Sequence, residues 1–417
     1  MNKILHVCSS FMPADIGGPA YCGAELLLGL DKVYIQEILS FSGGINKKEW
    51  NIKYNLYAPI FTNSKIIFFS FSLFGYIHFI YRLILFIIHN RRSHVVIHGI
   101  HNVPYLISTF LCNIFRAKSY IIPHGTLSEN CIQVSSNFLV KNFTLLYAKV
   151  FLRYHNIVFS NKNEYSMSVL SKPSELKGFK INFIPNILST RSLFEYIDFL
   201  PKKLVFRKQP VNLSNQIEHD VENKLNKYKK LELYPRIEII YFGRISIEKG
   251  IEKLIEFIDS DYSTDNAKLV VHIIGGCEDK YFSYIKNKCK SINGHKFIFY
   301  GWLPRDSAHS LLKIIPGVMI FPSLSDNFNL SFLESILLGK KAIVSNRINT
   351  VYDDWLSSRI KILKIESFTT SLKNILNDQS LIKESMDDEK DQFNCLPIEV
   401  HPYSQKNIIK EWFEILK

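Results

Sequence analysis

The chain has 417 residues, of which 47% are hydrophobic and 21% charged, and its formal net charge is +13. At roughly 150 residues per domain this length predicts about two or three domains and excludes a small disulfide-stapled protein. Scarce glycine and proline and the high hydrophobic fraction exclude collagen-like, low-complexity and globally disordered chains. Residues 1–188 hold 18 basic and 8 acidic residues, so the first half alone carries +10. This half is expected to meet an anionic partner: nucleic acid, a membrane surface or a phosphorylated substrate.

The N-terminal apolar segment is too short for the core of a signal peptide and predicts a first buried strand, Ile4–Cys8. The seven cysteines are scattered, and none has zinc-ligand spacing. Cysteines such as Cys8 in apolar segments are typical core residues, so the sequence favours a reduced, cytoplasmic compartment.

Short apolar, β-branched segments alternate with helical patterns along nearly the whole chain. This alternation predicts parallel sheets covered by helices on both faces, in two doubly wound α/β domains. The expected strands are Ile4–Cys8, Val95–His98, Ser119–Ile122, Ile157–Ser160, Ile181–Ile184, Ile237–Phe242, Leu269–Ile274, Phe297–Tyr300, Val318–Phe321 and Ala342–Ser345. The expected helices include Val103–Phe115, Ser136–Leu152, Ile251–Ile258, Ser307–Ile314 and Ser331–Leu338. The predicted domains are 1–188 and 237–400, with a linker or insertion at 189–236 and a C-terminal helix, 401–417, that packs back on the first domain.

Ile66–Ile88 is almost entirely apolar and is followed by two arginines. We interpret it as one or two buried amphipathic helices that lead into the strand Val95–His98. A helix on a membrane surface is the alternative, because cations flank the segment. A membrane-spanning helix is disfavoured by His78 and Arg82 within it.

Doubly wound domains bind ligands in the loops at the carboxyl ends of their strands, and two such domains predict a site in the cleft between them. The loop predicted at Ser9–Gly23 contains Gly17 and Gly18, whose amides can approach an anion closely. Its spacing is not that of a dinucleotide fingerprint, and a plain flexible loop is the alternative.

A second loop, Gly243–Gly250, follows the strand Ile237–Phe242. Arg244 at the strand end and Lys249 at the start of the next helix can grip a diphosphate, through forked hydrogen bonds and a point charge respectively. Two unrelated surface cations would have the same spacing.

A third loop follows the strand Val318–Phe321 and leads into an apolar helix whose N-terminal amides suit a phosphate. Asp326 and Glu334 flank this turn and can hydrogen-bond sugar hydroxyls. Asp326 is alternatively a helix cap, whereas Glu334 lies among apolar residues and needs a partner.

The Gly-Arg-x4-Lys-Gly pattern, followed by the Asp326-x7-Glu334 turn, resembles the retaining glycosyltransferases of family 4, in particular those of bacterial surface polysaccharides such as O-antigen and capsule. Weaker matches are Val95–His101, which resembles the family's strand ending in His-Gly, and Pro123-His124-Gly125, Pro185-Asn186, Ile274-Gly275-Gly276 and Tyr300-Gly301-Trp302-Leu303. The resemblance implies the GT-B fold, in which an acceptor-side domain faces a nucleotide-sugar-binding domain across a cleft.

The resemblance also implies roles. Arg244 and Lys249 would stabilise the departing nucleotide diphosphate, Asp326 and His124 would contact the donor sugar, and Glu334 would bind the ribose. The remaining implied donor-binding residues are Gly17, Gly18, Gly275, Trp302, Leu303, Asn327, Phe328, Asn329 and Leu330. No metal and no cofactor would be required.

The chain departs from the family pattern at the third loop. Asp326 stands where the family usually has Glu, and Asn327 and Asn329 replace glycines, although Asn tolerates positive φ best among the non-glycine residues. These departures leave open a catalytically weakened binding protein. The sequence is also compatible with a nucleotide-sugar epimerase on the same fold, and with a metal-dependent glycosyltransferase that uses Asp259-Ser260-Asp261. A nucleic-acid binder is disfavoured because no recognition motif accompanies the charge.

The expected partners are a nucleotide sugar, a polyprenyl-diphosphate-linked or other glycan acceptor, and an anionic membrane surface. The expected location is the cytoplasm, on the inner face of the cytoplasmic membrane. Alternatively, the basic first half reflects only a composition rich in Lys, Ile and Asn, without any membrane role.

Overall fold

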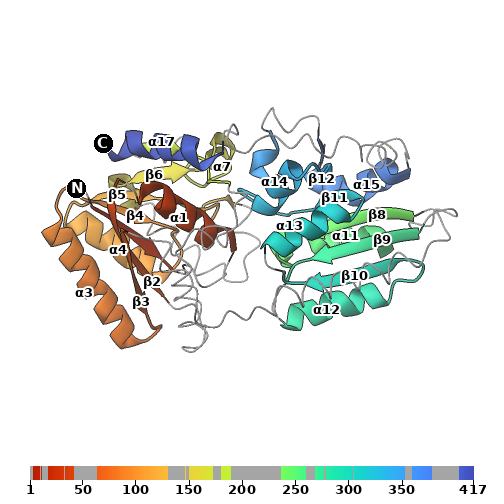
Figure 1. Cartoon of the computed structure of the whole chain (residues 1–417), viewed down its shortest axis with the longest axis horizontal. Coiled ribbons are helices and arrows are strands. Elements are labelled where there is room, and N and C mark those ends of the chain that lie inside the picture. The colour runs from red at the N-terminus through yellow and green to blue at the C-terminus, as the bar shows by residue number, and fades with distance from the viewer. Residues whose placement is uncertain are drawn as a thin grey trace, which may run out of the picture. The chain divides into compact units, whose positions relative to one another are not determined.

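The structure is a computed structural model that describes residues 3–9, 11, 17–31, 33–41, 63–129, 146, 150–171, 180–188, 236–259, 268–276, 279–303, 305–352, 359–377 and 403–417. The described residues fall into two compact units. Unit 1 comprises those up to residue 188 together with 403–417, and unit 2 comprises 236–377. Each unit is an α/β structure built on one parallel sheet (Figure 1).

Unit 1 contains a seven-stranded sheet of order β3-β2-β1-β4-β5-β6-β7. Every neighbouring pair is parallel. The order of the strands reverses at β1, which makes the boundary between β1 and β4 the topological switch point. The strands are β1 Lys3–Cys8, β2 Ile35–Phe41, β3 Ser64–Phe69, β4 His94–Ile97, β5 Lys118–Ile121, β6 Asn156–Phe159 and β7 Lys180–Phe183.

Helices cover both faces of this sheet (Figure 1). On one face, α3 (Leu73–His89) and α4 (Val103–Ile114) pack against alternate strand residues such as Leu5 and Val95. On the other face, α1 (Gly17–Leu30) packs with α17 (Gln405–Leu416), so the C-terminal helix belongs to the core of unit 1. The described part of unit 1 also contains a short helix, α7 (Lys162–Ser166), and a 3-10 turn, η2 (Leu152–Tyr154).

Unit 2 contains a six-stranded parallel sheet of order β10-β9-β8-β11-β12-β13. Its switch point lies between β8 and β11. The strands are β8 Arg236–Phe242, β9 Lys268–Ile274, β10 Lys296–Gly301, β11 Val318–Phe321, β12 Ala342–Ser345 and β13 Ile360–Leu363. The helices are α11 Ile251–Asp259, α12 Asp279–Lys290, α13 Arg305–Ile314, α14 Leu330–Leu337 and α15 Phe368–Asn377, with 3-10 turns η3 Ile247–Lys249, η4 Asn349–Tyr352 and η6 Ile365–Ser367.

The helices of unit 2 also form two layers. α11, α12 and α15 share one hydrophobic core with the sheet. The connections that contain α13 and α14 lead from β10 to β11 and from β11 to β12, which is the opposite direction along the sheet from β8 to β9 to β10. Since such connections are right-handed, α13 and α14 lie on the other face. The predicted fold class, two doubly wound α/β domains, is thus confirmed.

All ten strands predicted from the sequence are present, each shifted by at most one residue at either end. Three strands were not predicted: β2, β3 and β13. Helices α12 and α15 were also not predicted. Most of the predicted helix Ser136–Leu152 and nearly all of the predicted linker 189–236 lie outside the described residues.

The prediction for Ile66–Ile88 was wrong at its first four residues, which belong to strand β3. The amphipathic helix predicted in this segment is confirmed as α3, Leu73–His89. It buries Gly75, Phe79, Leu83 and Phe86 on one face and leaves Phe74 82% exposed. Among the helices that the structure describes, none is long and apolar enough to cross a membrane.

The prediction of a loop at Ser9–Gly23 was also wrong in its second half, because Gly17 and Gly18 are the first residues of helix α1. Pro19 explains why a helix can begin there, since the first helical turn has no intrahelical partner for its N–H groups and tolerates proline. The described cysteines, Cys8, Cys22, Cys112 and Cys289, are free and buried, as expected of core residues; the other three lie outside the described residues.

Candidate functional site

The switch point of unit 2 brings two of the predicted loops together. The loop after β8, Gly243–Gly250, and the loop after β11, Pro322–Asn329, leave adjacent strands at the same edge of the sheet. Their backbones bond directly, because the amide of Leu324 donates to Glu248 O at 2.8 Å. Loops at such a point are the usual ligand sites of doubly wound sheets.

Lys249 and Asp326 meet across this junction. The Lys249 ammonium donates to Asp326 Oδ2, and the carboxylate side chain is only 9% exposed. Backbone bonds hold Asp326 in place from both sides, since its N–H donates to Arg347 O and its carbonyl accepts from Asn349 N, each at 3.0 Å. The structure therefore places the carboxylate as the partner of the lysine.

Arg244 is the exposed cation of the same junction. It follows Gly243 at the end of β8, and its carbonyl accepts a hydrogen bond from Tyr241 Oη at 2.9 Å, which fixes the backbone at this point. Within the described part of the chain its guanidinium forms no ion pair. Its five donors are thus available to an anion.

Gly250 allows the two loops to touch. It adopts a left-handed conformation, φ 67°, and a Cβ there would overlap the carbonyl oxygen of Pro322. Gly275 has a similar role in the loop after β9, because a Cβ on it would overlap Gly243 O. The short distance between backbones at this edge of the sheet therefore depends on glycine.

Replacement of Gly250 by alanine is expected to lower the free energy of unfolding by about 2–5 kcal/mol, from the left-handed backbone and from the overlap with Pro322. Gly294→Ala is the matched control, because Gly294 also has positive φ, 82°, but no atom lies within 4 Å of its added Cβ. Its expected cost is about 1–2 kcal/mol. Urea unfolding followed by circular dichroism measures both, and equal costs would show that the two loops do not depend on this contact.

The turn after Asp326 is closed by asparagines. Asn329 is the N-cap of α14, and its Oδ1 accepts from Phe332 N at 2.9 Å, so the alternative interpretation of Asp326 as the cap is wrong. Asn327 Oδ1 accepts from Asn349 Nδ2 at 3.2 Å. Phe328 is buried and Leu330 begins the helix. Of the predicted residues of this loop, Asp326 contacts Lys249, whereas both asparagine side chains already have structural hydrogen bonds.

Glu334 is buried on α14, as the apolar residues around it suggested, and it has a partner. The Nε2 atom of His309, on α13, lies 3.0 Å from Oε2 of Glu334. His309 was not predicted from the sequence, although its position on the predicted helix Ser307–Ile314 was a usable signal.

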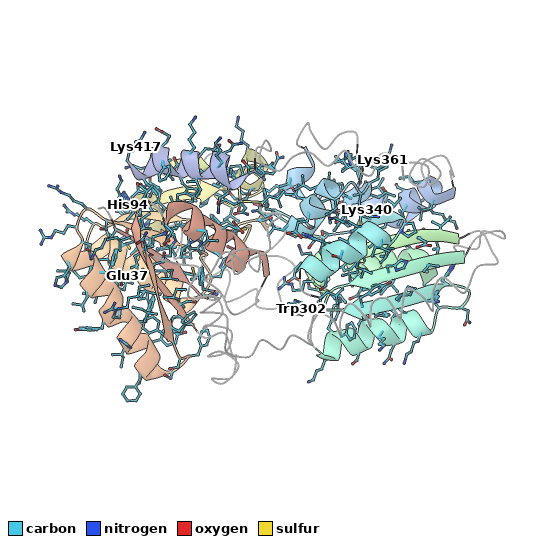
Figure 2. The ribbon with its side chains drawn as sticks, viewed as in Figure 1. Glu37, His94, Trp302, Lys340, Lys361 and Lys417 are labelled. Carbon is cyan, nitrogen blue, oxygen red and sulfur yellow. The ribbon has the colours of Figure 1, made fainter. Side chains whose placement is uncertain are left out.

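The other two predicted loops of unit 2 lie at the same edge of the sheet. Gly275 N donates to Gly301 O at 2.9 Å, which joins the loops after β9 and β10. Trp302, labelled in Figure 2, is 60% exposed, whereas Leu303 is half-buried. The exposed indole offers a ring face to a planar ligand group.

A separate polar network lies inside the sheet of unit 2. His272 bonds Glu238 Oε2 at 3.1 Å and Tyr300 Oη at 2.9 Å across β8, β9 and β10. Burial raises the pKa of Tyr300, so its hydroxyl donates to the ring. Lys340 (Figure 2) donates to Ile315 O at 2.6 Å, and burial lowers its pKa to about 8. These buried groups stabilise the sheet through hydrogen bonds, and they were not predicted from the sequence.

Of the predicted site residues, His124 lies in unit 1, where it follows β5 in a left-handed conformation, φ 51°. It is half-buried, its ring centroid lies 5.8 Å from that of His98 in a stacked arrangement, and desolvation lowers its pKa to about 4. Its Nε2 has no hydrogen-bond partner within the described residues. Gly17 and Gly18, in α1, belong to the same unit.

A hydrogen-bonded chain sets the protonation of the neighbouring histidines. Gln36 Nε2 donates to Leu27 O at 2.9 Å, so its Oε1 accepts from His6 Nε2 at 3.1 Å. The bare His6 Nδ1 then accepts from His98 Nε2 at 3.1 Å. Burial lowers the pKa of His6 to about 4 and that of His98 well below its ordinary value, so both rings are neutral. His98 therefore presents an unprotonated Nδ1 at the switch point of unit 1.

No group of three or more metal-ligating side chains occurs among the described residues. Of the Asp-x-Asp sequence Asp259-Ser260-Asp261, the structure describes only Asp259, which is the last residue of helix α11. A metal centre at a strand end, as the metal-dependent alternative would require, is thus not visible in the described residues, and metal independence stays a prediction.

Comparisons with known proteins agree with this geometry. Residues 223–353 match the model of the family described as glycosyl transferases group 1, a range that includes Arg244, Lys249, Asp326 and Glu334. A segment of 127 residues is 30% identical to the uncharacterized glycosyltransferase MJ1607 of Methanocaldococcus jannaschii. It covers 30% of this chain and 31% of that protein, so the match spans about a third of the relative's length.

Solved structures are similar over the whole chain. HepE from Anabaena, in complex with UDP-glucose, matches with a TM-score of 0.65 and 13% identity over 99% of both chains. Sucrose-phosphate synthase from Thermosynechococcus elongatus matches with a TM-score of 0.65 and 13% identity over 100% of this chain and 98% of that one. The fold is therefore that of these GT-B neighbours, and the match to the group 1 model lies in unit 2.

Proposed function

We propose that this protein is a glycosyltransferase that transfers a sugar from a nucleotide-diphosphate sugar to a glycan acceptor with retention of anomeric configuration. The observation that carries the proposal is the junction of two switch-point loops in unit 2, where the loop of Arg244 and Lys249 meets the loop of Asp326, and Lys249 contacts Asp326. HepE, which shares the fold, was solved with UDP and with UDP-glucose, which supports a nucleotide sugar as the donor. Retention follows from the resemblance to family 4.

The chemistry requires charge stabilisation at the leaving diphosphate. Arg244 supplies forked donors, and Lys249 supplies a point charge whose position is set by Asp326. Preorganised cations stabilise developing negative charge without reorganisation during the reaction, so no metal is needed in this proposal. Glu334, held by His309, is proposed to bind the ribose.

Ligand stabilisation tests the donor. Full-length protein is heated with UDP, GDP, ADP and their glucose conjugates, with and without EDTA. At about 100 times Kd, a bound nucleotide adds about 2.7 kcal/mol and raises Tm by several degrees. We expect one base to stabilise, and EDTA to have no effect. No stabilisation by any nucleotide would overturn the proposal, and loss of stabilisation in EDTA would overturn metal independence.

The acceptor is proposed to be a glycan on polyprenyl diphosphate, made for a surface polysaccharide on the cytoplasmic face of the membrane. The +10 charge of residues 1–188 supports this, because both the lipid diphosphate and the membrane surface are anionic. Transfer of radiolabelled sugar to lipid-linked acceptor, with no product from the donor alone, is the expected result. A new nucleotide sugar formed without acceptor would favour an epimerase instead.

A further inference from the structure

Two neighbouring helices of unit 1 expose apolar side chains to solvent. Along α3, the exposed residues recur at helical spacing and are large: Leu73, Phe74, Ile77, Tyr81 and Ile88, with Phe71 just before the helix. α4 continues the apolar surface with Val103, Phe110 and Ile114. Leu73 is 76% and Phe74 82% exposed, far more than isolated surface hydrophobics need to be.

The two helices run in the same direction on the same face of the sheet. Both are crossovers between parallel strands, β3 to β4 and β4 to β5, and both pack on one hydrophobic cluster. Their C-termini therefore lie at the same edge of unit 1 (Figure 1). Exposed cations follow each helix at that edge: Arg91 and Arg92 after α3, Arg116 and Lys118 after α4.

Negative charge is missing from this part of the chain. Between Glu49 and Glu129 the sequence contains no Asp or Glu, although it contains seven Lys or Arg residues. One of them, Arg82, is paired with Glu37 of β2 (labelled in Figure 2) at 3.2 Å. The surface of α3 and α4 is consequently apolar along its length and cationic at one end, with no carboxylate of its own segment to neutralise it.

We propose that this surface docks on an anionic lipid bilayer, with α3 lying in the interface. An apolar stripe that enters the acyl boundary and adjacent arginines that meet lipid phosphates are the two features that interfacial helices combine. A second copy of the chain fits less well, because a two-fold contact would place each cationic cluster against either the same cluster or the apolar start of α3, and neither neutralises the charge. A nucleic acid would not use the exposed Phe and Leu side chains of α3.

The proposal also explains the position of the exposed apolar residues at the start of α3. Phe71, Leu73 and Phe74 follow β3 directly, so they lie at the carboxyl edge of the sheet, the edge at which His98 and His124 follow their strands. Docking would thus bring that edge of unit 1 close to lipid-linked molecules. This last step rests on the proposed function, whereas docking itself does not.

Vesicle co-sedimentation of the full-length protein, without donor or acceptor, tests the docking. Wild type is expected to bind vesicles of phosphatidylcholine mixed with phosphatidylglycerol at low salt, to dissociate as salt rises, and to bind phosphatidylcholine alone much more weakly. Phe74→Glu/Ile77→Glu should weaken binding at least about tenfold. Arg91→Gln/Arg92→Gln should weaken it on the order of 10- to 30-fold and flatten the salt dependence.

The matched control is Ile314→Glu on α13 of unit 2, where the exposed fraction is 57% against 54% for Ile77. It should bind like wild type, and all variants should keep the wild-type Tm because the changed side chains are exposed. The proposal is overturned if wild type binds neither vesicle, if neutral and anionic vesicles bind equally, or if Phe74→Glu/Ile77→Glu breaks a dimer seen by ultracentrifugation. Since no substrate is present, failure here would leave nucleotide binding and sugar transfer to a soluble acceptor unaffected.

Discussion

Arg244→Ala and Lys249→Ala are each expected to lower the turnover of sugar transfer by on the order of 10²–10³. Both cations lie in the loop after β8 at the switch point, Arg244 exposed and Lys249 against Asp326. Removal of a preorganised positive charge should act mainly on the step in which the diphosphate departs, so kcat should fall more than KM rises. Steady-state kinetics with donor and acceptor measure both parameters.

Lys253→Ala is the matched control for this pair. Lys253 lies one turn further on, in α11, and forms an exposed ion pair with Glu256 at 2.9 Å. Such surface pairs contribute little to stability, so this variant should keep near-wild-type kcat and Tm. If Arg244→Ala and Lys249→Ala also turn over like wild type, the assignment of the diphosphate site to these cations is wrong.

The contact between Lys249 and Asp326 requires a second control. Lys249→Ala leaves a carboxylate that is 9% exposed without its partner, which is expected to destabilise unit 2. Arg244 has no such partner within the described residues, so its replacement should lower kcat without lowering Tm. The double variant Lys249→Ala/Asp326→Asn also removes the unpaired negative charge of Asp326. If kcat in that double variant stays low while Tm recovers, the loss of turnover comes from the missing cation.

The pair also changes the interpretation of the Asp326 substitution. The resemblance assigned Asp326 to the donor sugar, with one methylene less reach than the usual Glu. In the structure the shorter carboxylate contacts the lysine of the neighbouring loop, while backbone bonds to Arg347 and Asn349 hold the main chain of Asp326. We therefore expect Asp326 to act at least partly as a positioning residue for Lys249. This contact joins residues 77 positions apart and could not be read from either motif alone.

Most of the strands that were predicted are buried on both faces, although β7 and β10 are only partly buried. Val95–Ile97 and Val318–Phe321 are continuous apolar segments because helices cover both sides of the sheet. The missed strands lack this pattern. β2 contains Gln36 and Glu37, which are accommodated by hydrogen bonds to His6 and Arg82. Between β3 and α3 only Ser70 and Ser72 interrupt the apolar side chains, so periodicity alone did not separate strand from helix.

The candidate site was predictable where one motif supplies a whole loop. Arg244, Lys249, Asp326 and Asn329 all lie where the strand-loop-helix pattern placed them. Partners contributed by other loops were not predictable, because a single sequence does not reveal which side chain of a neighbouring element faces inward. His309 on α13 and the chain from Gln36 through His6 to His98 are of this kind.

Unit 1 is expected to unfold as the pH falls from about 6.5 towards 4, while unit 2 remains folded. Burial lowers the pKa of His6, His94, His124 and His155 to about 4, and that of His98 well below its ordinary value. All five lie in unit 1. In the unfolded chain these rings titrate near pH 6.5, so below that pH the unfolded state binds more protons than the folded state.

The direction of the pH dependence follows from this difference in bound protons. The stability that depends on neutral rings is fully present above about pH 6.5 and is lost as the pH falls through the window down to about 4. Near pH 5 each deeply buried ring costs on the order of 1–2 kcal/mol, and several together approach the whole stability of a typical domain, about 5–15 kcal/mol. In unit 2 a lowered pKa is resolved only for His295 among the described histidines.

Hydrogen exchange of the full-length protein, read by mass spectrometry of its peptides, separates the units. Protection of β1, β4, β5 and β6 should decline below about pH 6 before that of β8, β9 and β11. His155→Asn should lower the pH midpoint, because the amide can still bond Ser119 Oγ, which contacts His155 Nδ1 at 2.5 Å, but cannot take up a proton. His78→Asn, on the exposed face of α3, is the control and should leave the midpoint unchanged. Earlier loss of protection in unit 2, or a unit 1 that stays protected at about pH 4, would show that the buried histidines do not limit the acid stability of this protein.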